Sequence, residues 1–186
     1  YHYEPAWFDA LDMDEIDAVY VCGLEVEDPT GPVVVEFLER ACRDKAIFFT
    51  PGPRPDSVPL DLLERVCALH PVLHMNGDEA MVLAGRLCDG ESVDDAKTEG
   101  DRADIERAAV ALARYVGNAV FATLGGGRSD VVAGSPAHVV DTIGAGDSHI
   151  GALMVGLHRG ETPESAIARA NRVAAAIVGI SGAHAG

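Results

Sequence analysis

Short apolar runs alternate with segments whose apolar residues recur every three or four positions, and this alternation constrains the fold more than any other feature of the sequence. The runs are rich in β-branched and aromatic residues and are bounded by glycine, proline or polar residues, as buried strands are. We expect strands at 18–23, 46–49, 72–75 and 119–122, and helices at 32–41, 60–70, 79–87 and 105–116. Strands that alternate with helices predict an α/β fold, with a mostly parallel sheet sandwiched between helices.

The rest of the sequence extends the same pattern. We expect two further strands, at 131–133 and 138–140, and two further helices, at 148–159 and 163–177. The last of these helices has Thr162 as N-cap and Pro163 in its first turn. Residues 89–104 are acidic and poor in apolar side chains, which indicates an exposed connection. The sequence has no internal repeat, so a single α/β domain accounts for residues 1–186.

Acidic side chains outnumber basic ones by 30 to 14, which gives a formal net charge of −16. Such a surface would repel a nucleic acid or an anionic membrane over most of its area, so neither is an expected partner. A bound phosphate compound must then be held by locally arranged donors. Backbone N–H groups supply such donors without any net positive charge.

The four cysteines, Cys22, Cys42, Cys67 and Cys88, include no C-x-x-C pair. Each lies in or beside an apolar run, so we expect reduced, buried thiols rather than a disulfide framework or a zinc site. No apolar run reaches the roughly 18 residues that a membrane helix needs, and no signal peptide opens the sequence. We expect a soluble cytoplasmic protein. Because the first residue is Tyr1 rather than Met, we also expect the sequence to be a piece of a longer protein.

A glycine-rich turn, Asp141-Thr142-Ile143-Gly144-Ala145-Gly146-Asp147, leads into the helix expected at 148–159. Small residues let the backbone bring the N–H groups of Gly144, Ala145 and Gly146 together, and the helix directs its positive dipole end to the same point. Asp147 would be costly beside a bound phosphate unless it accepts a proton from an attacking hydroxyl. The turn therefore predicts phosphoryl transfer to an alcohol. Alternatively, it links a strand to a helix without a ligand, and Asp147 caps the helix.

Polar residues also follow two of the expected strands. Asn76 and Glu79 come after the third strand, at the carboxyl edge of the sheet, where open α/β folds place ligands. An amide and a carboxylate there suit a hydrated Mg²⁺ that bridges nucleotide phosphates. Alternatively, Asn76 forms the turn and Glu79 interacts with the dipole of the next helix. Thr123 and Gly125 leave the fourth strand at the same edge, in a position to meet a nucleotide.

Several of these segments together resemble one known family. Asp141 to Asp147 resembles the D-T-x-G-A-G-D signature of the ribokinase-like (PfkB) carbohydrate kinases. Three more segments occur in the family's order: Asn76-Gly77-Asp78-Glu79 resembles its N-x-x-E motif, Thr123-Leu124-Gly125 its nucleotide-binding T-x-G turn, and Ala170-Asn171 a helix near its end. Ser181-Gly182-Ala183 resembles a loop beside the adenine and the cation. Arg128 stands where members often carry glycine; it either reaches a phosphate or is a solvated loop residue, and we favour the latter.

The resemblance implies an ATP-dependent kinase that phosphorylates a hydroxyl of a sugar or sugar-like small molecule. It implies Asp147 as general base, Asn76 and Glu79 as residues for Mg²⁺, and Thr123, Gly125 and Asn171 as residues for the nucleotide. It places Asp141 and Thr142 near the phosphates and a monovalent cation such as K⁺, although both also suit a purely structural turn. Alternatively, Asn171 is a surface residue of the last helix without a role in nucleotide binding.

The family places its first strands, a small β lid and its sugar-gripping residues before the point at which this sequence starts. The acceptor therefore stays open among ribose, fructose-type sugars, 2-keto-3-deoxygluconate and nucleosides, and a homodimer is possible. The alternative function is a non-catalytic nucleotide- or sugar-binding protein of the same fold, which has no need of a base at Asp147. A dinucleotide-binding oxidoreductase would carry a G-x-G-x-x-G turn after an early strand, and the sequence has none. The sequence assigns no role to His149.

Overall fold

The computed structural model describes residues 3–88, 102–124 and 144–178. The chain divides into two compact units, Tyr1–Ala122 and Thr123–Gly186. The strands predicted at 131–133 and 138–140 lie outside the described residues.

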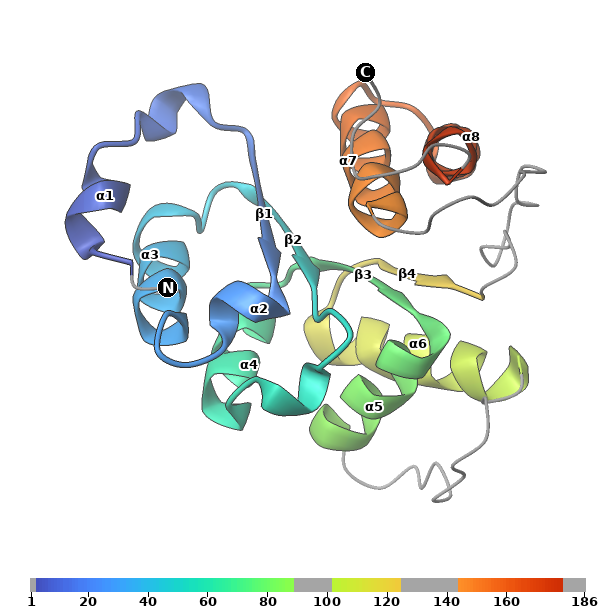
Figure 1. The fold of residues 1–186 in the computed structure, drawn as a ribbon, viewed down its shortest axis with the longest axis horizontal. Coiled ribbons are helices and arrows are strands. Elements are labelled where there is room, and N and C mark those ends of the chain that lie inside the picture. Colours follow the sequence, from blue (N-terminus) through green and yellow to red (C-terminus); the bar gives the residue numbers. More distant parts are fainter. Residues whose placement is uncertain (1–2, 89–101, 125–143, 179–186) are drawn as a thin grey trace. The chain divides into compact units, whose positions relative to one another are not determined.

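A four-stranded sheet forms the centre of the first unit (Figure 1). Its strands are β1 (Ala18–Cys22), β2 (Ala46–Thr50), β3 (Val72–Asn76) and β4 (Val120–Thr123), in that spatial order. β1 pairs in parallel with β2, and β2 in parallel with β3. β4 lies beside β3, where the N–H of Leu73 donates to the carbonyl of Ala119 at 3.0 Å. The four predicted strands and the mostly parallel sheet are confirmed.

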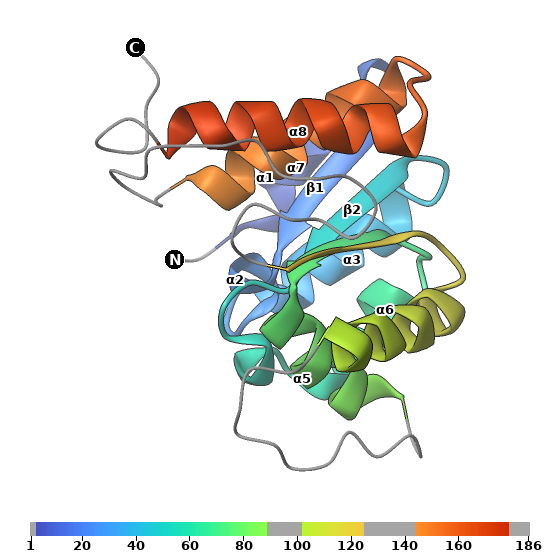
Figure 2. The same ribbon diagram turned by 90° about the vertical axis from the view of Figure 1, so that its right-hand side faces the viewer.

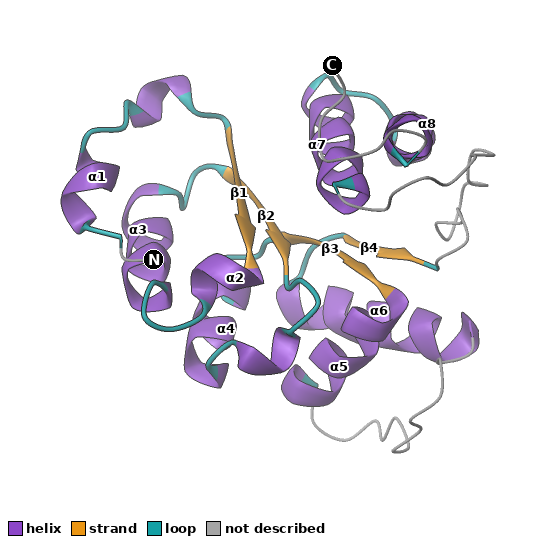
Figure 3. Cartoon of the chain, in the orientation of Figure 1, coloured by secondary structure: helices purple, strands orange, loops and turns teal. Residues whose placement is uncertain are grey.

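The helices that connect consecutive strands lie on one side of this sheet (Figure 3). They are α3 (Gly31–Ala41), α4 (Leu60–Cys67), α5 (Gly77–Leu87) and α6 (Arg102–Val116). The strand order follows the chain order, so every right-handed crossover advances in the same direction and places its helix on the same face. Fully buried leucines from all four helices meet the sheet residues Phe49 and Leu73 in one core: Leu38, Leu63, Leu83 and Leu112.

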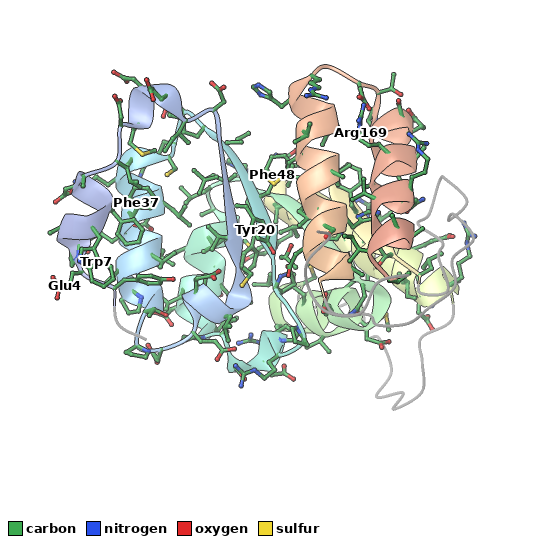
Figure 4. All side chains as sticks on the ribbon, turned by 45° about the horizontal axis from the view of Figure 1, so that its top comes forward. Glu4, Trp7, Tyr20, Phe37, Phe48 and Arg169 are labelled. Atoms are coloured by element: carbon green, nitrogen blue, oxygen red, sulfur yellow. The ribbon has the colours of Figure 1, made fainter. Side chains whose placement is uncertain are left out.

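A short N-terminal segment is attached to the outer side of α3. It contains the helix α1 (Pro5–Asp9) and a 3₁₀ turn, Met13–Glu15. The ring of Phe8 stacks on Phe37 of α3 with centroids 4.4 Å apart, and Trp7 on the same short helix is 54% exposed (Figure 4). Aromatic stacking therefore holds this N-terminal segment against α3.

The structure differs from the predicted elements mainly at their ends. The short helix α2 (Gly23–Val26) follows β1 directly, because a carboxylate oxygen of Glu25 accepts the N–H of Cys22 at 2.8 Å and caps it. Four residues are too few to show a helical period, so the sequence pattern missed this helix. A second 3₁₀ turn, Pro55–Ser57, occupies the proline-rich connection before α4. The predicted start of α6 was three residues late.

The second unit contains two antiparallel helices, α7 (Ala145–His158) and α8 (Pro163–Ile177), which lie side by side in Figure 2. The two backbones approach closely, because a Cβ added at Gly156 would lie 2.8 Å from the Cβ of Ala166. The predicted N-cap of α8 is confirmed: the hydroxyl of Thr162 accepts the N–H of Ser165 at 3.3 Å. An ion pair of Arg169 with Glu161 joins α8 to the connecting turn.

The cysteines fit their predicted state. All four are free thiols, with Cys42 and Cys67 buried and the other two half-buried. Burial is the largest cause of the raised pKa values of Cys67, about 12, and Cys22, about 11. Among the residues that the structure describes, no helix has the length and apolar character needed to cross a membrane.

Candidate functional site

The carboxyl end of β3 continues without a loop into α5, and Asn76 and Glu79 meet there. The side-chain oxygen Oδ1 of Asn76 accepts the N–H of Glu79 at 2.8 Å, and Oε2 of Glu79 accepts the N–H of Asn76 at 3.0 Å. This reciprocal capping box satisfies two backbone donors that the helix itself leaves without partners. The structural role that the sequence left open for both residues is therefore present.

The same turn carries an electrostatic cost. Glu79 is half-buried, and burial raises the pKa of its carboxyl group. The neighbouring charge of Asp78 raises that pKa further, whereas the hydrogen bond from Asn76 opposes the rise. A positive ion near Glu79 would relieve this cost, because it favours the charged carboxylate.

The position of this turn is fixed by close packing behind it. A Cβ added at Gly77 would lie 2.4 Å from Cδ1 of Ile105 on α6. A side chain at Gly77 would have to displace Ile105, so the second residue of the N-x-x-E segment serves packing. The backbone at the end of β3 is consequently held firmly against the helical layer.

The start of α7 is built differently. Its N-cap, Gly144, has φ +77° and ψ −2°, which is the left-handed region that favours glycine. Ala145, Gly146 and Asp147 follow as the first three helical residues, and the N–H of Ser148 donates to the carbonyl of Gly144 at 2.9 Å. No side chain of the described residues caps this helix.

The first turn of α7 is also open to solvent. Gly146 and Asp147 are exposed, and a Cβ added at Gly146 would meet no described atom within 4 Å. Helix starts combine N–H groups without intrahelical partners with the positive end of the helix dipole. This turn therefore presents anion-binding backbone groups and a carboxylate side by side.

Asn171, predicted to face the nucleotide, lies in the interface between the two helices of the second unit. It is 9% exposed, and its Oδ1 accepts a hydrogen bond from Nε2 of His149 at 3.1 Å. His149 is 6% exposed, and burial is the main cause of its lowered pKa. The sequence assigned no role to His149. It shows only a polar residue beside the apolar stripe of the predicted helix, which does not identify a partner on α8.

The structure groups some of the predicted residues and leaves others outside its described part. Asn76 and Glu79 share one turn of the first unit, and Gly144, Ala145, Gly146 and Asp147 share one turn of the second. Thr123 is the last residue of β4 and is half-buried. Gly125, Asp141 and Thr142 lie outside the described residues, as do Arg128 and Ser181. Within the described part, no cluster of three His, Cys, Asp or Glu residues is arranged to hold a metal ion.

Comparisons with known proteins agree on one family. The model of the pfkB family carbohydrate kinases matches residues 2–186. An uncharacterized sugar kinase of Escherichia coli strain K12, YegV, is 31% identical over 176 residues, which is 95% of this chain and 53% of that protein.

Solved structures show the same fold. A ribokinase from Thermotoga maritima superimposes with a TM-score of 0.67 at 20% identity, over 95% of this chain and 56% of the other. For a ribokinase from Cryptococcus neoformans in complex with ADP the TM-score is 0.70 at 18% identity, over 94% and 59%. An aminoimidazole riboside kinase from Salmonella enterica, complexed with its riboside and an ATP analog, gives 0.66 at 19% identity, over 90% and 58%. The chain thus spans a little over half the length of each of these relatives.

Proposed function

The chain belongs to the pfkB family of carbohydrate kinases, and from this we propose that the protein transfers the γ-phosphoryl group of ATP to a hydroxyl of a sugar or sugar-like small molecule. The bond between the γ-phosphorus and the bridging oxygen of ADP breaks, and a bond from the acceptor oxygen to phosphorus forms. The hydroxyl proton leaves to a base. The other products are ADP and the sugar phosphate.

The start of α7 is the observation that carries this proposal. Backbone N–H groups of Gly144, Ala145 and Gly146 in the first turn suit the charge that builds on the transferred group, and the helix dipole adds to their effect. Asp147 follows in the same exposed turn. Its carboxylate would take the proton of the acceptor hydroxyl, a role worth about 10² to 10⁴ in rate.

The nucleotide and its ions complete the proposal. Solved relatives contain ADP or an ATP analog, which supports ATP as the donor here, with Thr123, Gly125, Thr142 and Asn171 as its residues. Mg²⁺ would neutralise charge on the phosphates. The carboxylate of Glu79 and the amide of Asn76 are hard oxygen ligands that suit it. The capping box uses Oε2 of Glu79 and Oδ1 of Asn76, so Oε1 of Glu79 is the oxygen that the box does not use. We further propose K⁺ near Asp141.

Similar kinases point to the class of acceptor. The curated relative is named a sugar kinase, and the solved relatives include ribokinases and a riboside kinase. We propose a sugar or nucleoside acceptor, a cytoplasmic setting and, as one option, a homodimer, with neither nucleic acid nor membrane as partner.

An activity assay on the full gene product that contains this chain tests the proposal. ATP consumption is measured with D-ribose, D-fructose, 2-keto-3-deoxygluconate and inosine, for wild type and Asp147→Asn. We expect at least one acceptor to be phosphorylated, and the variant to lose about 10²-fold or more in kcat. Glu164→Gln, which removes an exposed carboxylate from the first turn of α8, is the matched control and should leave kcat unchanged. Equal turnover by wild type and Asp147→Asn would refute the role of Asp147.

A further inference from the structure

Among the described residues, little fixes the first turn of α7 in place. The turn includes Gly146 and follows Gly144, and glycine is less favourable than alanine inside a helix. All side chains of this turn are exposed or half-buried. The buried face of α7 begins only at His149 and Ile150. Among the described residues of this unit, His149 connects that part of α7 to Asn171 of α8.

His149 makes that connection through a directed hydrogen bond. Its Nε2 lies 3.1 Å from Oδ1 of Asn171, and because a carbonyl oxygen only accepts, the ring carries its proton on Nε2. Burial lowers the pKa of His149 and so favours the neutral ring. The donor and the acceptor come from facing positions of two helices, 22 residues apart in the sequence.

Packing alone would not call for a polar pair here. Elsewhere Gly156 of α7 lies against Ala166 of α8, and the inner face of α7 carries the fully buried Leu153. A buried hydrogen bond adds little net stability, but a buried partner that loses its hydrogen bond is costly. Any slide or rotation of α7 along α8 would separate the two groups. The pair therefore selects one register of the helices, as buried polar pairs do in coiled coils.

We propose that His149 is a positioning residue for phosphoryl transfer. Its hydrogen bond to Asn171 fixes the register of α7 against α8 and so holds the turn Gly144–Asp147 in one arrangement relative to Asn171. This inference rests on the proposed function, since it concerns the same turn. His149 itself touches neither phosphate nor acceptor in this scheme.

Two substitutions in the full gene product separate positioning from packing. His149→Phe fills the space but donates no hydrogen bond, whereas His149→Gln keeps an N–H near the place of Nε2. kcat and the KM for ATP and for the best acceptor are measured at a temperature at which circular dichroism shows every variant folded. We expect kcat to fall about 10- to 100-fold for Phe, because small displacements of a catalytic turn are costly, and to stay within about threefold of wild type for Gln. Val155→Ala, at an exposed position of α7, should leave kcat unchanged.

Other results would overturn the inference. His149→Phe with a lower melting temperature but the kcat of wild type would reduce His149 to a packing residue, and so would a Gln variant as slow as the Phe variant. Neither result would affect the role of Asp147. Conversely, full turnover by Asp147→Asn would remove the proposed function itself, and this inference with it.

Discussion

Two helices of this protein, α5 and α7, begin in opposite ways. At α5 the N-cap Asn76 has extended backbone, and its side chain and that of Glu79 cap each other's N–H groups. At α7 the N-cap Gly144 is left-handed, and no described side chain caps the helix. The start of α5 satisfies two of its own backbone donors, whereas the start of α7 presents its donors together with the exposed Asp147.

The difference bears on how the two starts would act on a phosphate compound. At α5 two N–H groups are already satisfied, and the carboxylate of Glu79 suits a cation better than an anion. The start of α7 suits an anion, through backbone groups and the helix dipole.

A side chain at Gly146 should produce the largest effect. It tests whether the uncapped start of α7 binds a phosphate group. We expect Gly146→Leu to lower kcat/KM for ATP about 100-fold in the full gene product, comparable to the loss of an oxyanion-hole donor. The leucine side chain would occupy the proposed place of the phosphate. Its Cβ would meet no described atom within 4 Å, so a clash at this atom does not explain a loss of activity. Steady-state kinetics measure the effect.

Gly151→Leu is the matched control, because Gly151 lies on the same helix, is exposed and has equally open space around an added Cβ. It should retain the kcat/KM of wild type. If both leucine variants lose activity equally, the effect belongs to the helix in general and not to an anion site at its start.

Removal of the charge at Glu79 tests whether the capped start of α5 binds Mg²⁺. Glutamine preserves a capping box, so Glu79→Gln should melt within about 2 °C of wild type, yet need about tenfold more Mg²⁺ for half-maximal activity. Asp78→Asn removes a neighbouring, exposed charge without touching the cap and is the control. A Mg²⁺ requirement that is identical in wild type and Glu79→Gln would leave the carboxylate with a purely structural role.

Loss of the cap itself should affect stability more modestly. Asn76→Ala removes the acceptor for the N–H of Glu79 and should cost about 1 kcal/mol of unfolding free energy. Asn76→Asp keeps an acceptor oxygen and should recover most of that loss. Urea denaturation of the 186-residue chain measures both. Equal stability of the alanine variant and wild type would show that the cap contributes nothing.

The sequence predicted the sheet and its helices because each strand and helix carries a local pattern. It did not separate the two roles of Asn76 and Glu79, because the same spacing that suits a metal also forms a capping box. The contact of His149 with Asn171 was out of reach for another reason. It joins two helices across 22 residues of sequence, and no local period indicates which positions of the two helices face each other.

The two regions should also respond to pH with opposite sign, which is the smallest expected effect. The pKa of His149 is lowered below 6.5, so the unfolded chain takes up this proton first, and stability is lost as the pH falls below 6.5 through the folded value. The pKa of Glu79 is raised above 4.5, so the folded chain takes up that proton first, and stability is gained as the pH falls through the raised value.

Melting temperatures between pH 7.5 and about pH 4.5 measure this contrast, because each variant removes one of the two titrations. On acidification from neutral pH, wild type should lose stability relative to His149→Gln and gain stability relative to Glu79→Gln. Wild type and each variant share all other titratable groups, so the contributions of those groups cancel in the difference between their melting temperatures. The sign of this difference is therefore informative even if all the proteins become less stable in acid. Parallel curves for wild type and His149→Gln would mean that the ring is not buried as a neutral donor, and the register argument for α7 would lose its physical basis.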